Sequence, residues 1–364
     1  MRTGSKPKPR EASAQVQAHR HPHPYPHPHP QVRVGEPPRQ DPGSSLWAVT
    51  TYYNPGRYRR RRANFDVFRA NLPMPLLAIE WSASAEFELL PGDAELLVQV
   101  TGGDVLWQKE RLLNLALEHL PPNCRQVAWV DCDIVFETAG IERLLLSMLG
   151  DCPIVQPYAS AGHVAPVPIE RMGADDAWRS APVWRELIGL VRSYREHGRW
   201  WDEDGALEAF IQRIGQRPTP GFAWAANRDF LTRHPPFDVW VVGGGDTAYA
   251  YAALDAPENV VQRQRLSAAH RELYLERAAA LRDELGDRIG FLDGRVLHLW
   301  HGDIDNRGYD ARHDILAAHE FDPARDLRLD TTGVWAWGEA ADSLREGVVR
   351  YFEQRREDDE PIDA

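Results

Sequence analysis

The sequence has little cysteine, no long apolar run and no excess of basic residues, and each shortage excludes a class of protein. Three cysteines in 364 residues, Cys124, Cys132 and Cys152, exclude a small disulfide-rich scaffold and predict free thiols in a reducing compartment. No stretch approaches the ~18–20 apolar residues of a membrane span, and the basic start of the chain lacks the apolar stretch of a signal peptide. We therefore expect a cytoplasmic protein with no transmembrane segment.

The charge balance excludes a further class. Lysine and arginine total 42 against 54 acidic residues, which gives a net charge of −12. This is the wrong sign for a protein that binds phosphate backbones, so no nucleic-acid partner is expected. The 43% hydrophobic and 26% charged content is typical of a globular protein that can bury a sizeable core.

The first 44 residues have almost no large apolar side chains. In their centre, histidine or tyrosine alternates with proline over 21–30, and prolines at this spacing exclude both helix and sheet. We expect residues 1–44 to form a disordered, solvated tail, although histidines at this spacing can also hold a divalent metal loosely. One catalytic domain is then expected over residues 45–357.

Hydrophobic periodicity predicts alternating strands and helices in the first half of this domain. The expected strands are 46–53, 75–81, 95–100, 126–136 and 153–156. The expected helices are one that carries Phe65, Phe68 and Leu72 and ends before Pro73, then 107–120 and 141–149. Such alternation indicates an α/β fold with a mainly parallel sheet and helices on both faces. In the second half, helical patterns occur at 183–196, 247–254, 266–285, 309–319 and 341–356.

Two carboxylates at the end of an apolar strand are the sharpest chemical signal. Asp131 and Asp133 flank Cys132 where the apolar run from Gln126 ends, and strand alternation predicts both side chains on one side. Adjacent carboxylates repel each other unless a cation lies beside them, so the pair predicts a divalent metal that holds a diphosphate.

These features resemble the nucleotide-sugar-dependent glycosyltransferases of the GT-A fold, which is Rossmann-like. The resemblance lies in the strand 47–53, in the helix with Lys109 and Asn114, and in the apolar strand that ends in Asp-x-Asp. It implies a nucleotide-binding half over 45–158 and an acceptor and metal-completing half over 159–357. It also implies that the nucleoside-diphosphate sugar is bound by Thr50, Tyr53, Asn54, Lys109, Asn114, Asp131 and Asp133.

The second half resembles the β-1,4-galactosyltransferase group of that fold. The segments 220–224 and 241–246 resemble its aromatic and glycine-rich loop, which leads to a catalytic base, here Asp246. Helix capping is the other reading of Asp246, and both can hold. His301 would take the place of that group's metal-binding histidine and His298 that of its methionine, with Asp133 as the carboxylate ligand. His298 can equally be a core histidine.

The resemblance implies a metal-dependent transfer of a sugar from a nucleoside diphosphate, preferentially UDP, to an acceptor hydroxyl with inversion. Imidazole and carboxylate ligands favour Mn²⁺ over Mg²⁺, which prefers oxygen ligands. Trp201 and Trp224 are candidate acceptor-site aromatics. Because Val242 replaces the group's tryptophan and Asp246 lacks the group's neighbouring acids, the donor sugar stays open.

Two other functions stay open. Residues 131–135 also fit the Asp-x-Asp-x-(Thr/Val) signature of haloacid-dehalogenase phosphohydrolases, with Asp131 as nucleophile and Asp133 as acid/base. Against this, three strands precede the signature, which normally opens that domain, and no lysine follows Lys109 to bind the phosphate. The third reading is a protein that binds a sugar or nucleotide without turnover.

Overall fold

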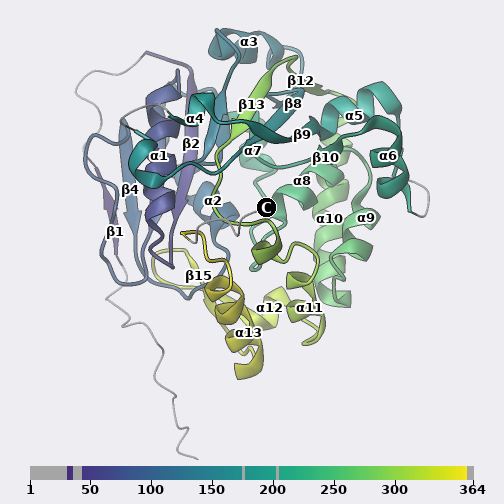
Figure 1. Ribbon diagram of the computed structural model, residues 1–364. Coiled ribbons are helices and arrows are strands. Elements are labelled where there is room, and N and C mark those ends of the chain that lie inside the picture. Colours follow the sequence, from purple (N-terminus) through teal and green to yellow (C-terminus); the bar gives the residue numbers. More distant parts are fainter. Residues whose placement is uncertain (1–30, 36–42, 174–176, 202–204, 359–364) are drawn as a thin grey trace, which may run out of the picture.

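The computed structural model of the chain describes residues 31–35, 43–173, 177–201 and 205–358, and is built around an eight-stranded sheet (Figure 1). The strand order is β1-β4-β3-β2-β5-β11-β7-β12. Strands β4, β3, β2 and β5 are parallel to one another, β11 runs antiparallel between β5 and β7, and β12 is parallel to β7. Their bounds are β1 Val32–Val34, β2 Leu46–Tyr53, β3 Leu76–Trp81, β4 Leu96–Val100, β5 Gln126–Val130, β7 Ile154–Gln156, β11 Ala223–Asn227 and β12 Ile289–Phe291.

A second sheet has five strands in the order β10-β9-β8-β13-β6, and a third has two. The bounds are β6 Ile134–Phe136, β8 Ser160–Val164, β9 Val183–Gly189, β10 Arg217–Thr219 and β13 Arg295–His298, then β14 Leu327–Leu329 and β15 Trp335–Trp337. Both larger sheets take strands from the two halves of the domain, so a site between them combines residues far apart in the sequence.

Helices cover both faces of the main sheet, as the hydrophobic pattern predicts (Figure 1). Trp47 and Val49 pack into the core that contains α2, α8 and α10, whereas Leu46 and Ala48 pack against α1 and α3. The helices are α1 Arg59–Asn71, α2 Lys109–His119, α3 Ile141–Met148, α4 Ala177–Ser180, α5 Leu190–His197, α6 Ala206–Ile214, α7 Arg228–Arg233, α8 Gly245–Ala253, α9 Pro257–Arg263, α10 Ala268–Leu285, α11 Arg312–Ala317, α12 Pro323–Asp326 and α13 Asp342–Glu353, with 3₁₀ turns η1 Ile169–Arg171 and η2 Asp305–Arg307. The α/β class is therefore confirmed. Among the described residues, no helix has both the length and the apolar character needed to cross a membrane.

Two expected elements are wrong in ways that matter for the site. The strand expected over 126–136 ends at Val130, turns with Ile134 N–H donating to the Asp131 carbonyl at 3.2 Å, and resumes as β6 in the other sheet. The helix expected over 183–196 begins only at Leu190, because 183–189 pair with β8 as strand β9. The apolar residues there occur in pairs, Val183 with Trp184 and Leu187 with Ile188, a spacing that resembles a helix, and pairing with the neighbouring strand decides the outcome.

The expected tail needs a correction over three residues. Strand β1 lies within the segment 1–44 and pairs antiparallel with β4, Val32 opposite Val100. The chain before residue 31 and residues 36–42 lie outside the described residues, and with them the histidine and proline repeat.

Candidate active site

A cavity of about 530 Å³ opens where the carboxyl end of β5 meets the second sheet, and residues from distant segments line it. Asp131 and Asp133 come from the turn after β5, and Lys109 comes from the start of α2. Asp246 comes from the first turn of α8, and His298 from the end of β13, with His301 three residues on. Asp133, Asp246 and His301, to which the resemblance gives roles in one active site, therefore line the same cavity.

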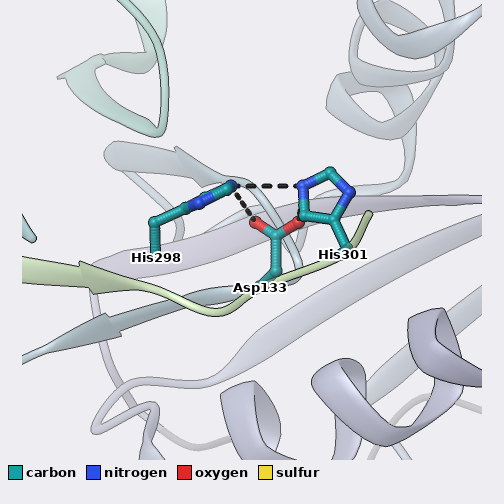
Figure 2. A group of neighbouring side chains, drawn as sticks. All are labelled: Asp133, His298 and His301. Carbon is teal, nitrogen blue, oxygen red and sulfur yellow. Dashed lines mark hydrogen bonds and ion pairs between the residues drawn. The ribbon is translucent and has the colours of Figure 1, made fainter. Parts of the chain in front are cut away.

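Asp133, His298 and His301 form a buried cluster with the ligand types of a metal site (Figure 2). His301 Nε2 lies 3.0 Å from Asp133 Oδ2, and His298 Nε2 lies 3.8 Å from Asp133 Oδ1. The two Nε2 atoms are 3.2 Å apart, and one donor atom of each residue lies within 4.8 Å of the others. Figure 2 shows both rings turned toward the carboxylate from one side.

The polar atoms of this cluster fit a divalent cation. Asp133 Oδ1 is buried and has no hydrogen-bond partner among the described residues. Donor atoms at right angles around an ion about 2.1 Å away lie about 3 Å apart, close to the Nε2 separation. Burial opposes the charge of Asp133, but the adjacent His301 and the Arg61 guanidinium hold the pKa of that carboxyl well below its usual range. Burial lowers the pKa of His298, which favours the neutral ring that a metal needs.

Asp131 has a different partner, although it lies two residues from Asp133. Its Oδ1 forms an ion pair with Lys109 Nζ at 2.5 Å, and the same ammonium lies 3.8 Å from Asp246 Oδ2. Burial raises the pKa of Asp131, and Lys109 opposes that rise. The two acids therefore have different partners: Asp133 belongs to the cluster with the histidines, and Asp131 pairs with Lys109.

Asp246 is placed by glycines. Gly243 and Gly244 have φ of 88° and 102°, a region that favours glycine, and Gly244 caps α8. Asp246 thus lies inside the first turn, where Oδ1 accepts from Thr247 N–H at 2.7 Å, and the expectation that it is the N-cap is wrong. A Cβ at Gly221 would lie 2.8 Å from Asp246 Oδ2, so that glycine leaves room for the carboxylate.

Five of the predicted site residues do not line the cavity, whereas Tyr53 does. Thr50 is fully buried and donates to the Val130 carbonyl at 2.7 Å. The Asn54 amide bonds the Glu88 carboxylate, and the Asn114 amide bonds Asp238 at 2.9 Å. Trp201 and Trp224 are buried in the main core. All five stabilise the fold around the site instead of facing a ligand.

Two buried arginines were missed by the sequence reasoning. Arg307 is 7% exposed and lines the cavity, where it donates to the Tyr309 hydroxyl at 3.0 Å and to the His301 carbonyl at 3.4 Å. Arg312 is 8% exposed and donates to Tyr351. Neither makes an ion pair with a described carboxylate, and the Nε atom of each has no hydrogen-bond partner in the described part of the chain. Their place after His301 in a glycine-containing loop was the available signal.

Comparison with known proteins yields weak structural likenesses only. No family model matches the sequence, and no curated protein matches it. The solved structures that it resembles include S. aureus TarS in complex with UDP-GlcNAc, with a TM-score of 0.35 and 12% identity over 76% of this chain and 69% of that one. Another is glucosyl-3-phosphoglycerate synthase from Mycobacterium tuberculosis with Mn²⁺, UDP-glucose and phosphoglyceric acid, with a TM-score of 0.31 and 12% identity over 81% and 87%. At this level the likeness assigns no function.

Proposed function

We propose that the protein is a metal-dependent glycosyltransferase of the GT-A type that moves a sugar from a nucleoside-diphosphate donor, preferentially a UDP-sugar, to an acceptor hydroxyl. The observation that carries the proposal is the convergence of two groups on one cavity. One is the buried cluster of Asp133, His298 and His301, and the other is the lysine-linked pair Asp131 and Asp246.

The departing diphosphate develops negative charge, and the cavity can hold it. Asp133, His298 and His301 would bind the divalent ion, Mn²⁺ in preference to Mg²⁺, which when bound stabilises that charge as a Lewis acid. Arg307 lies beside His301 and pairs with no carboxylate of the described residues, so its guanidinium would donate to phosphoryl oxygens. Asp131 would accept hydrogen bonds from the donor, as the ribose-side neighbour of Asp133.

The acceptor hydroxyl has to lose a proton as it attacks. Asp246 lines the same cavity, and its carboxylate is the proposed general base. Lys109 lies between Asp131 and Asp246, 2.5 Å from Asp131 Oδ1 and 3.8 Å from Asp246 Oδ2, so its ammonium offsets the repulsion between the two carboxylates. One base and direct displacement give inversion at the anomeric carbon.

The geometry favours this function over the phosphohydrolase. That alternative needs Asp133 as a proton-carrying acid/base beside Asp131. Asp133 is instead directed at His301 Nε2, 3.0 Å away, and Asp131 is directed at Lys109. A buried carboxylate between two imidazoles is suited to a cation and not to donating a proton.

The test is a thermal-shift screen of UDP and UDP-sugars with Mn²⁺, with Mg²⁺ and with EDTA. A ligand at 100 times its Kd stabilises the native state by about 2.7 kcal/mol, so a clear rise in Tm is expected with metal and little rise with EDTA. CDP- and GDP-sugars serve as nucleotide controls. If no nucleoside-diphosphate sugar raises the Tm with either metal, the proposal is refuted.

A further inference from the structure

A row of cavity-facing side chains crosses the second sheet away from the metal cluster. His298 on β13 is paired with His163 on β8, and His163 is paired with Arg185 on β9. Leu187 shares the face of Arg185 because it lies two residues on, and Leu187 is paired with Arg217 on β10. All five residues line the cavity, so the row leads from a metal ligand to two arginines.

These arginines have no described acid to pair with. Arg185 and Arg217 are half-buried, and within residues 31–35, 43–173, 177–201 and 205–358 neither forms a hydrogen bond or an ion pair through its guanidinium. Arg263, at the end of α9, also lines the cavity, and it forms an ion pair with Asp310, an exposed residue 3.4 Å away. In a chain with a net charge of −12, three guanidinium groups beside one another in a cavity indicate a binding site for an anion.

The cluster is electrostatically costly as it stands. Burial, then repulsion from Arg263 and Arg185, lowers the pKa of Arg217, and the nearby acids Asp310 and Glu208 do not fully offset this. Like charges held together in a partly buried cavity become favourable when an anion lies between them. Arginine forks match the planar, bidentate geometry of phosphate and carboxylate oxygens.

Arg217 lies too far from the metal cluster to contact the donor diphosphate. Three strand steps lie between β13, which carries His298, and β10, which carries Arg217, and at ~4.8 Å per step this is roughly 14 Å. Two phosphoryl groups that share a bridging oxygen and bind one ion at Asp133 do not extend that far. Arg307, which donates to the His301 carbonyl, lies beside the metal cluster and would bind the diphosphate.

We propose that Arg185, Arg217 and Arg263 bind an anionic group, a phosphate or a carboxylate, carried by the acceptor whose hydroxyl takes the sugar. The inference rests on the proposed transferase function and adds the chemical class of its second substrate. The acceptor's anion would lie at the β9–β10 side of the cavity while its hydroxyl points to Asp246.

The test uses the full chain and simple anions as probes. Inorganic phosphate and malonate are titrated by calorimetry into wild type, Arg217→Gln and Arg185→Gln, each with and without saturating UDP and Mn²⁺. Arg213→Gln is the matched control, because Arg213 is an exposed arginine on α6, four residues before Arg217, and is absent from the cavity lining. We expect one of the two anions to bind wild type and the control equally, and to bind each cavity variant about 10-fold or more weakly. The UDP affinity should stay within about twofold.

Three results would overturn the proposal. Anion binding that both cavity variants retain would show that the arginines hold no anion. A parallel fall in UDP affinity would assign them to the diphosphate. A tenfold selective loss of UDP-glucuronic acid binding relative to UDP-glucose would assign them to an acidic donor sugar. If UDP fails to bind wild type, the transferase proposal and the acceptor assignment fail together, whereas arginine-dependent phosphate binding without UDP would still establish the anion site.

Discussion

The Nε2 atoms of His298 and His301 lie 3.2 Å apart, closer than two uncharged rings need to be unless they share a proton or a ligand. Both atoms face the Asp133 carboxylate, whose Oδ1 has no described hydrogen-bond partner (Figure 2). One divalent ion would satisfy all three side chains at once. The sequence spacing of the two histidines, which end β13 and begin the following loop, is what brings their rings together.

We therefore expect His301→Ala to lose divalent metal. Changes to groups that only support metal ligands typically cost 10–100-fold in affinity, so the loss of a direct ligand should weaken Mn²⁺ binding by about 100-fold or more. Calorimetry or electron paramagnetic resonance of Mn²⁺ would measure this. His319→Gln is the control, since His319 bonds Ser343 outside the cavity. The proline-rich histidine tail is present in every variant, so the difference isolates the cluster; equal Mn²⁺ affinity in His301→Ala and wild type would remove the site.

The part of the site that could be predicted consists of acidic residues that directly follow a strand or begin a helix. Asp131 and Asp133 follow an apolar strand, and Asp246 follows glycines at a helix start, so their place at one sheet edge could be read from the sequence. Asn54 and Asn114 could not be assigned, because their partners are set by the fold; Asp238, which bonds Asn114, is 124 positions away. A polar side chain near a motif has the same appearance whether it faces a ligand or a neighbouring loop.

The grouping of Arg185 with Arg217 could not be predicted, because the secondary structure expected for 183–196 was wrong. With 183–196 read as a helix, Arg185 has no predicted relation to Arg217. As strand β9, the same residues alternate sides and bring both arginines to one face through the pairing of Leu187 with Arg217. Single-sequence periodicity does not reveal which strand a short segment pairs with, and here that pairing determines the chemistry of the cavity.

Asp246→Asn should separate catalysis from binding. Asparagine keeps the size of the side chain but cannot accept the acceptor's proton, so kcat should fall by about 10²–10⁴-fold while the donor Kd changes little. Steady-state kinetics with calorimetry of the UDP-sugar gives both numbers. Asp255→Asn, the same change beyond the other end of α8, is the control. A variant with wild-type kcat would show that another group is the base, and unchanged binding with no turnover in either protein would favour the non-catalytic reading.

The ion pair of Lys109 and Asp131 should contribute to stability as well as to the site. Lys109→Met leaves Asp131 and Asp246 without their shared cation, and the free energy of unfolding should fall by about 1–2 kcal/mol at pH 7, less than for a fully buried pair because Asp131 is partly exposed. Urea unfolding of Lys109→Met, Asp131→Asn and the double variant measures the coupling between the two residues. Arg192→Met in the exposed pair with Glu196 should cost only a few tenths of a kcal/mol. Strictly additive effects of the two substitutions would show that the pair is not coupled.

The last prediction concerns His270, a buried histidine that does not line the cavity. It is 1% exposed, packs on the rings of Trp240 and Phe321, and has no hydrogen-bond partner at Nε2 among the described residues. Burial lowers the pKa of His270 to about 3, against an ordinary value of 6.5. Between these two pH values the unfolded chain binds a proton at this ring that the folded chain does not, so the native state loses stability as the pH falls below 6.5.

The loss should amount to about 1.4 kcal/mol per pH unit, or about 2 kcal/mol at pH 5, and should vanish above 6.5, where both states are neutral. His270→Leu removes the ring that binds this proton in the unfolded state, and it keeps an apolar side chain in the aromatic pocket. Its unfolding free energy, measured in urea from pH 7.5 to pH 4.5, should therefore fall less steeply than that of wild type by about one proton. The absolute stability at pH 7.5 corrects for any change in packing. If His270→Leu keeps the wild-type slope, this histidine is protonated in the folded protein and the burial account is wrong.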